Sequence, residues 1–125
     1  AAMILAQAGD VAEQLTQVFV NLFTNAAQAM RDQGGCLEIA TELAGGGASV
    51  RVRISDDGHG IEPEHLPRIF DPFFTTRTDG TGTGLGLSIV RSIVDAHGGY
   101  VRAERRATRG MMFSVELPAV LPAKP

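Results

Sequence analysis

The sequence predicts an α/β domain, and three observations support this fold class. Two segments, about 11–31 and 85–97, repeat apolar residues at helical spacing, whereas at least four shorter segments alternate apolar with polar residues as strands do. Of the 125 residues 44% are hydrophobic, which is enough for one compact core. No linker or internal repeat divides the chain. We therefore expect a single domain over 1–125, with a Pro/Ala-rich tail at 118–125.

The overall composition excludes several classes of protein. The net charge is −3 and the eleven basic residues are scattered, so we expect no nucleic-acid surface. The single cysteine, Cys36, excludes an internal disulfide and fits a reducing compartment. The apolar start, 1–6, is too short to span a bilayer and has no basic flank. It is compatible with the remnant of a strand, and we expect a fragment of a longer protein.

The first helix is predicted from Val11 to Arg31, with Asp10 as its cap and Glu13 in the manner of a capping box. Asn25 falls at the edge of its apolar face, and Asn21 lies one turn earlier. An unpaired buried amide costs about 1–3 kcal/mol, so these side chains need partners. Nearby backbone groups would serve, and so would a hard metal ion with its phosphates. The apolar face consists of Leu15, Val18, Phe19, Leu22, Ala26 and Ala29.

Two alternating runs follow and are joined by the hairpin signal Gly45-Gly46-Gly47. The first run places Leu37, Ile39, Thr41 and Leu43 on one face, and the second places Val50, Val52 and Ile54 on one face. If the second strand continues through Asp56, this carboxylate points into the core with Ile54. A buried carboxylate needs a donor, either a backbone N–H of a turn or the exocyclic amine of a nucleobase. Gly58 and Gly60 would allow the sharp turn and a close approach of a ligand.

Pro63 is predicted to begin a short helical turn over 64–69. The next stretch, 70–77, has three phenylalanines before a polar, glycine-rich segment, which is the composition of a hinged lid. We expect residues 74–83 to be mobile without ligand and more ordered with it.

The glycine-rich stretch 78–86 runs directly into the second helix, whose apolar positions are Leu85, Ile89, Ile93 and Ala96, widened by Val90 and Val94. Free N–H groups at a helix start bind anions, above all phosphates, although a plain flexible loop is the alternative. No Gly-Lys-Ser/Thr closes the stretch and no strand precedes it, which excludes a Walker P-loop and a Rossmann turn. His97-Gly98-Gly99 would end the helix. Strands are predicted at 100–105 and 111–117, with Phe113, Val115 and Leu117 facing inward.

Four of these segments together resemble the motifs of the ATP-binding catalytic domain of sensor histidine kinases, within the wider family of gyrase-type and MutL-type ATPases. Residues 17–29 are similar to the N box, 56–61 to the first glycine box, 69–77 to the phenylalanine box and 82–87 to the second glycine box. The resemblance covers about 15–118. One such motif is weak evidence, whereas four in the right order and spacing are specific.

The resemblance implies a two-layer α/β sandwich of the Bergerat type, with helices on one face of a mixed sheet and a flexible ATP lid. It implies a protein-histidine kinase domain that binds Mg-ATP and gives the γ-phosphoryl group to a histidine on another domain. Asn25 would bind Mg²⁺, Asn21 would hold phosphates and Asp56 would accept from the adenine amine, with Asn21, Asn25 and Arg77 as the catalytic residues. The implied nucleotide-binding residues are Asn21, Asn25, Gln28, Asp56, Gly58, Gly60, Ile61, Phe70, Thr75, Thr76, Arg77, Gly82, Thr83, Gly84, Leu85, Gly86 and Leu87.

The implied partners are the phosphoacceptor-histidine helical domain of the same parent protein and a response-regulator receiver domain. We expect a cytoplasmic domain without direct membrane contact, whether or not the parent is membrane-anchored. Two positions depart from the family pattern: Arg77 stands where lysine is frequent, and Met111 where a small or hydroxyl residue is frequent. None of the three histidines lies in a phosphoacceptor context. A non-catalytic nucleotide-binding or docking domain is the alternative reading, and the intact motifs argue against it.

Overall fold

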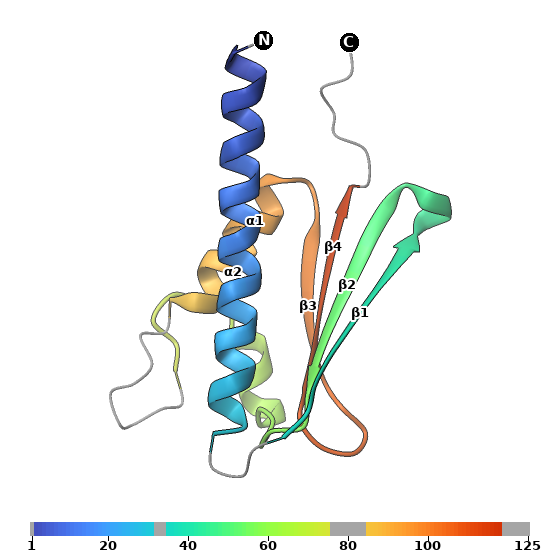
Figure 1. Ribbon diagram of the computed structural model, residues 1–125. Helices are drawn as coiled ribbons and strands as arrows, with labels where there is room; N and C mark the ends of the chain where they lie inside the picture. Colours follow the sequence, from blue (N-terminus) through green and yellow to red (C-terminus); the bar gives the residue numbers. More distant parts are fainter. Residues whose placement is uncertain (1, 32–34, 76–84, 119–125) are drawn as a thin grey trace.

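The computed structural model describes the backbone of residues 2–31, 35–75 and 85–118, and the side chains of these residues from position 12 onward. Two helices lie on one face of a four-stranded sheet, which confirms the predicted two-layer α/β sandwich (Figure 1). The elements are α1 (Ala2–Ala29), β1 (Leu37–Ala44), η1 (Gly45–Gly47), β2 (Ser49–Asp56), η2 (Pro63–Arg68), α2 (Gly86–Ala96), β3 (Tyr100–Arg105) and β4 (Met111–Pro118).

The sheet has the strand order β1-β2-β4-β3. Each neighbouring pair is antiparallel, so the expected mixed sheet is wrong for the strands that the structure describes. The reason is connectivity: β1–β2 and β3–β4 are hairpins, and β4 returns beside β2 in the opposite direction. Strand β1 is the edge of the sheet that lies farthest from the two helices (Figure 1). Ile39 on β1 is therefore 53% exposed, although it faces the same side of the sheet as its buried neighbour Ile54.

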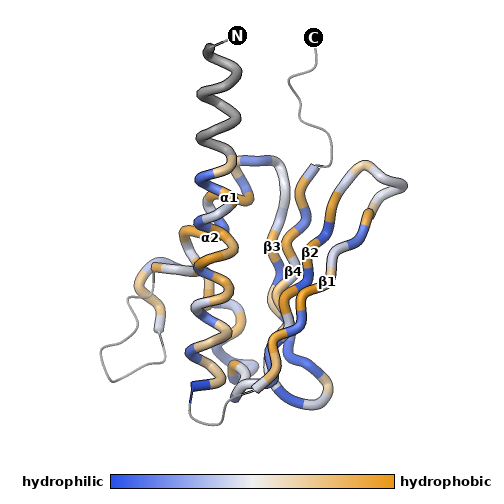
Figure 2. The backbone as a smooth tube through the Cα atoms, viewed as in Figure 1, coloured by the Kyte–Doolittle hydropathy of each residue, from blue (hydrophilic) through white to orange (hydrophobic). Residues whose placement is uncertain are grey.

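The hydrophobic core lies between the helices and the central strands. Helix α1 contributes Val18, Leu22 and Ala26, as its predicted apolar face requires. Figure 2 shows the hydrophobic residues along α2 and, in alternation with hydrophilic ones, along the strands. The buried side chains that form one cluster are Val18, Leu22, Ile54, Ile69, Val90, Val94, Met111, Phe113 and Val115.

Two predictions about the helices are wrong. Helix α1 already begins at Ala2, so Asp10 lies inside it instead of capping it, and the first residues are helix instead of a strand remnant. In α2 the buried positions are Val90 and Val94, whereas Ile89 is 38% exposed. The predicted ends of α2 are confirmed: Leu85 is the N-cap and His97 the C-cap, and the Gly99 N–H donates to the Val94 carbonyl. Among the described helices none is long and apolar enough to cross a membrane.

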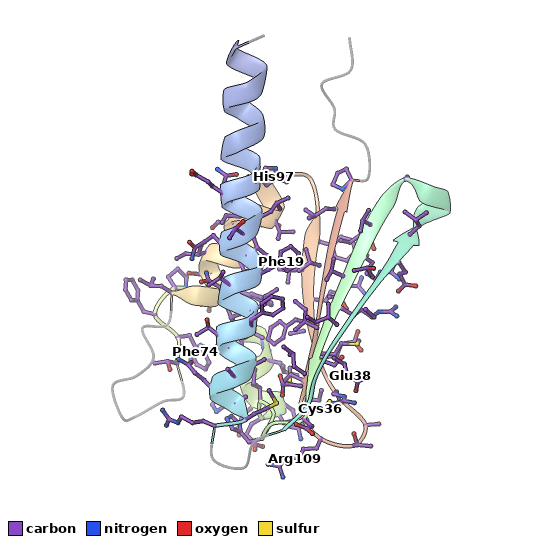
Figure 3. All side chains as sticks on the ribbon, in the orientation of Figure 1. Phe19, Cys36, Glu38, Phe74, His97 and Arg109 are labelled. Atoms are coloured by element: carbon purple, nitrogen blue, oxygen red, sulfur yellow. The ribbon has the colours of Figure 1, made fainter. Side chains whose placement is uncertain are left out.

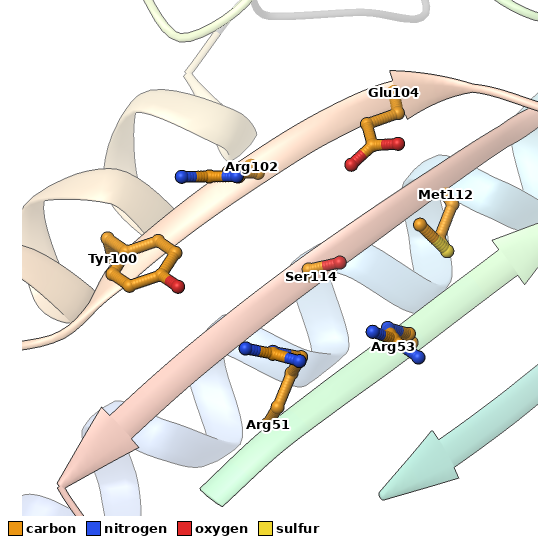
Figure 4. Close-up of a pocket in the computed structure, with 7 residues that line it drawn as sticks. All are labelled: Arg51, Arg53, Tyr100, Arg102, Glu104, Met112 and Ser114. Atoms are coloured by element: carbon orange, nitrogen blue, oxygen red, sulfur yellow. The ribbon is translucent and has the colours of Figure 1, made fainter. Parts of the chain in front are cut away.

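The face of the sheet opposite the helices is polar and carries a shallow cavity of about 180 Å³ (Figure 4). Its charges are balanced: Arg51 contacts Glu116 at 2.9 Å, and Arg53 contacts Glu42 at 2.9 Å. The hydrogen bond from Tyr100, followed by the guanidinium of Arg51, lowers the pKa of Glu116. The cavity is lined by Arg51, Arg53, Tyr100, Arg102, Glu104, Met112 and Ser114, none of which belongs to the predicted site.

Candidate functional site

The predicted site residues gather where the end of α1 meets the end of β2. The His59 N–H donates to the carbonyl of Ala29, the last residue of α1, at 3.3 Å. This contact joins the turn after Asp56 to the helix that carries the two asparagines. The structure therefore brings together two segments of the predicted site that are about thirty residues apart in the sequence.

Asp56 is only 2% exposed and points inward, as the strand parity predicts. Its Oδ1 atom accepts hydrogen bonds from the Gly58 N–H at 2.9 Å and from the Met111 N–H at 3.4 Å. Of the two donors that the sequence analysis considered for Asp56, the backbone N–H of a turn is thus confirmed for Oδ1. Within the described part of the chain, Oδ2 accepts no hydrogen bond, so it can accept from a ligand.

Gly58 is buried directly against the end of α1. A Cβ at this position would lie 2.5 Å from the Ala29 carbonyl oxygen, which is too close for any side chain. We expect Gly58→Ala to push the turn away from the helix and lower the free energy of unfolding by about 1–3 kcal/mol. Urea unfolding measures this loss. Gly46→Ala is the matched control, because a Cβ there meets no atom within 4 Å and only its positive φ of 69° is unfavourable; an equal loss in both variants would contradict the expectation.

The two asparagines on α1 differ in their contacts. Asn21 is half-buried and bonded at both ends: its Nδ2 donates to the Gly86 carbonyl at 3.2 Å, and its Oδ1 accepts from Gln17 at 2.9 Å. The first of these bonds ties α1 to the beginning of α2. Asn25 is also half-buried, yet its side chain makes no hydrogen bond to the described residues. Gln28 lies one turn further on and is half-buried too.

The aromatic segment after η2 is anchored at both ends. Phe70 packs edge-on against Phe113 with ring centroids 6.4 Å apart, and Phe74 lies under Arg68, whose guanidinium is 4.6 Å from the ring centroid. Between them Phe73 is 73% exposed and has a left-handed φ of 67°, which is unusual for a bulky residue. Contacts of both rings with neighbouring side chains therefore hold residues 70–74 in place, just before the chain continues into the glycine-rich stretch. Ile61, from the first glycine box, packs against the same core, whereas Thr75 is exposed.

Part of the predicted site lies outside the described residues, namely Thr76, Arg77, Gly82, Thr83 and Gly84, and with them most of the expected lid. Leu85, Gly86 and Leu87 are described and form the start of α2. The Ile89 N–H donates to the Leu85 carbonyl, so α2 begins its regular hydrogen bonding there. The N–H groups in the first turn of a helix have no partner within the helix, so the start of α2 is compatible with the predicted anion site, which stays a prediction.

Three arginines that the sequence did not single out also contact the site. Arg105 is the last residue of β3, and Arg106 and Arg109 lie on the loop between β3 and β4. All three donate to backbone carbonyls of residues 56–61, and Figure 3 shows Arg109 at this end of the molecule. Arg105 reaches the Ile61 carbonyl, Arg106 the Asp56 carbonyl, and Arg109 the carbonyls of Asp57 and Gly58. No periodic pattern marks these residues, and the only signal in the sequence is the density of arginine in the short stretch 105–109.

The side chains available as metal ligands restrict how a metal ion could be bound. Among the described residues no group of three or more His, Cys, Asp and Glu side chains could bind a metal ion. A hard ion such as Mg²⁺ nevertheless needs only one or two protein oxygens when phosphates supply the others. The carbonyl oxygen of the Asn25 carboxamide fits that requirement.

Comparison with known proteins agrees with this geometry. Residues 10–121 match the model of the family described as histidine kinase-, DNA gyrase B-, and HSP90-like ATPase. The chain is 39% identical over 112 residues to the sensor histidine kinase ZraS of Escherichia coli, covering 90% of this chain and 23% of ZraS. The catalytic domain of the histidine kinase ThkA is 39% identical with a TM-score of 0.72, covering 86% of this chain and 68% of that one.

Two further solved structures are complexes of histidine kinases. ShkA, solved at full length in complex with AMPPNP, is 32% identical with a TM-score of 0.70, covering 90% of this chain and 23% of ShkA. ThkA in complex with the response regulator TrrA is 36% identical with a TM-score of 0.69, covering 88% of this chain and 30% of that one. The chain thus spans less than a quarter of the length of ZraS and ShkA.

Proposed function

Since the chain belongs to the family of histidine kinase-, DNA gyrase B- and HSP90-like ATPases, and its relatives include sensor histidine kinases, we propose that it binds Mg-ATP. We further propose that it donates the γ-phosphoryl group to a histidine on a separate helical domain. The single observation that carries the proposal is the Asp56 carboxylate. It is buried, two backbone N–H groups hold it through Oδ1, and its other oxygen accepts no bond from the described residues. Such an oxygen suits the exocyclic amine of adenine.

The phosphates would lie between α1 and the start of α2. Asn21 is fixed there by its bond to the Gly86 carbonyl, and the start of α2 would offer its N–H groups to the phosphates. Asn25 would hold Mg²⁺, which supplies positive charge against the phosphates when bound. Arg77 and the glycines of the second glycine box are proposed to complete the phosphate site.

The same helix argues for transfer to a protein histidine over hydrolysis. Attack by water needs a base within hydrogen-bond reach of the γ-phosphate. Hydrolytic relatives use a glutamate one turn before the metal-binding asparagine, whereas this chain has Asn21, whose carboxamide orients but does not take a proton. Glu13 lies on the same continuous helix about three turns from Asn25, roughly 18 Å along its axis. The domain therefore lacks a water-activating base on α1.

A transfer assay tests the proposed function. The chain alone, with γ-labelled ATP and Mg²⁺, should neither label itself nor release phosphate in multiple turnovers. Addition of a histidine-bearing helical domain of the parent kinase should give acid-labile label on that domain, and its His→Gln variant should stay unlabelled. Robust hydrolysis by the chain alone would move it to the ATPase branch, and ATP binding without any transfer would indicate a docking domain.

Further partners and location follow from the same proposal. ThkA has been solved in complex with a response regulator, and we propose that a receiver domain takes the phosphoryl group from the labelled histidine of the parent kinase. We place the domain in the cytoplasm, where ATP is available, as part of a parent protein that has other domains.

A further inference from the structure

We propose that Arg106 and Arg109 are positioning residues of the turn that presents Asp56, a role that rests on the proposed nucleotide binding. Neither side chain belongs to the motifs that carry the family resemblance. Both lie on the loop between β3 and β4, which Figure 1 places at the same end of the sheet as the end of β2. Their effect on a base would therefore pass through the turn 56–60.

The first argument is the hydrogen-bond geometry. Arg106 Nη1 donates to the Asp56 carbonyl at 3.0 Å. Arg109 Nε lies 3.0 Å from the Asp57 carbonyl and 2.9 Å from the Gly58 carbonyl, so one N–H is shared between two successive acceptors. Three consecutive carbonyls of the turn thus point at two guanidinium groups.

The second argument is that strand pairing provides no donors for these carbonyls from β4. The pairing between β2 and β4 ends with Ser55 opposite Met112, one residue before Asp56. The arginines supply donors to these partly buried carbonyls from the neighbouring loop. Hydrogen bonds from a charged donor are roughly twice as strong as neutral ones.

The third argument is that the loop itself is fixed. The Arg106 N–H donates to the Gly110 carbonyl at 2.9 Å and closes the hairpin, and Arg106 also lies 3.5 Å from Glu38 on β1. Gly110 has a φ of 94°, and a Cβ there would overlap the Asp56 carbonyl. The hairpin end and the turn are therefore in direct contact, and the arginines do not reach across open solvent.

The consequence concerns the acceptor geometry of Asp56. The Gly58 and Met111 N–H groups that orient this carboxylate belong to the turn and to the strand that begins after the loop. A small shift of the turn changes the angle at Oδ2, and hydrogen bonds weaken steeply when they lose alignment. The two arginines would thus adjust selectivity for adenine without touching the base.

The test uses the whole chain with Arg106→Gln, Arg109→Gln and Arg109→Lys. The matched control is Arg102→Gln, which removes the same charge from β3 but whose side chain lies over the Tyr100 ring, 5.2 Å from its centroid. Two quantities are measured: amide exchange at Gly58 and Met111 in the free protein by NMR, and the Kd for ADP, ATP and GTP by calorimetry.

We expect Arg106→Gln and Arg109→Gln to speed up exchange at both amides and to weaken ADP binding, each by about tenfold, with a smaller preference for ATP over GTP. Arg109→Lys should behave like Arg109→Gln, because lysine keeps the charge but has no Nε–H group that the two carbonyls could share. Unchanged exchange, rescue by lysine, or the same changes in Arg102→Gln would overturn the inference. If the unmodified chain binds no nucleotide, the proposed function fails, while the exchange rates still decide whether the arginines hold the turn.

Discussion

Asp56→Asn should weaken ATP binding by about a hundredfold while leaving GTP binding little changed. The variant oxygen can still accept from Gly58 and Met111, which places the new NH₂ group where Oδ2 was. A donor then faces the adenine amine, which is also a donor, whereas guanine presents a carbonyl at the corresponding ring position. The size of the loss follows from a charge-assisted hydrogen bond of about 1.5–3 kcal/mol. Calorimetric titration with ATP and GTP measures both affinities.

The neighbouring residue provides the control. Asp57→Asn removes the same charge one position away, but the Asp57 side chain points outward and accepts from the Cys36 N–H at 2.9 Å. We expect this variant to keep its preference for ATP. Equal losses of ATP and GTP affinity in Asp56→Asn would mean that the carboxylate only supports the turn, and the assignment of the base site would then be wrong.

Asn25→Ala should abolish the dependence of ATP binding on Mg²⁺ and lower the affinity in Mg²⁺ by about a hundredfold. The motive is a half-buried carboxamide that makes no hydrogen bond within the described part of the chain. Loss of a hard oxygen ligand removes the metal from the site, since Mg²⁺ relies on few protein ligands. Titration of ATP in Mg²⁺ and in EDTA compares the two conditions directly.

This variant should fold normally, because alanine favours helix more than asparagine does and no described hydrogen bond is lost. Thr24→Ala, at an exposed position next to it on α1, is the control and should keep the full response to Mg²⁺. A metal response that persists in Asn25→Ala would exclude Asn25 as the metal ligand. A loss of binding in both variants would indicate a general effect on α1.

Much of the architecture could be predicted because it depends on local periodicity. The alternation of apolar residues located the four strands and the first hairpin, and the two-residue period placed Asp56 on the same side as Ile54. The spacing of apolar residues located the buried face of α1. Glycines and asparagines at fixed offsets also identified the family, which residues 10–121 match.

The predictions were wrong at the start of α1 and on the buried face of α2, where the local sequence favours two alternatives about equally. Asp10 is a good cap residue, yet the residues before it favour helix and a single Gly9 costs only about 1 kcal/mol, so α1 continues through it. In α2 the stripes containing Ile89 and Val90 are both apolar. The positions of α1 and the sheet select Val90 and Val94 for burial.

The contacts that shape the site depend on long-range packing. Asn21 is fixed by the carbonyl of Gly86, sixty-five positions later, and Asp56 by the N–H of Met111, fifty-five positions later. The arginines of the loop between β3 and β4 meet residues 56–58 only because β4 pairs antiparallel with β2 and starts where β2 ends. Residue types, motif order and strand parity therefore identify the chemistry from the sequence. The partner that each donor and acceptor meets follows from strand pairing and helix packing, which no local pattern encodes.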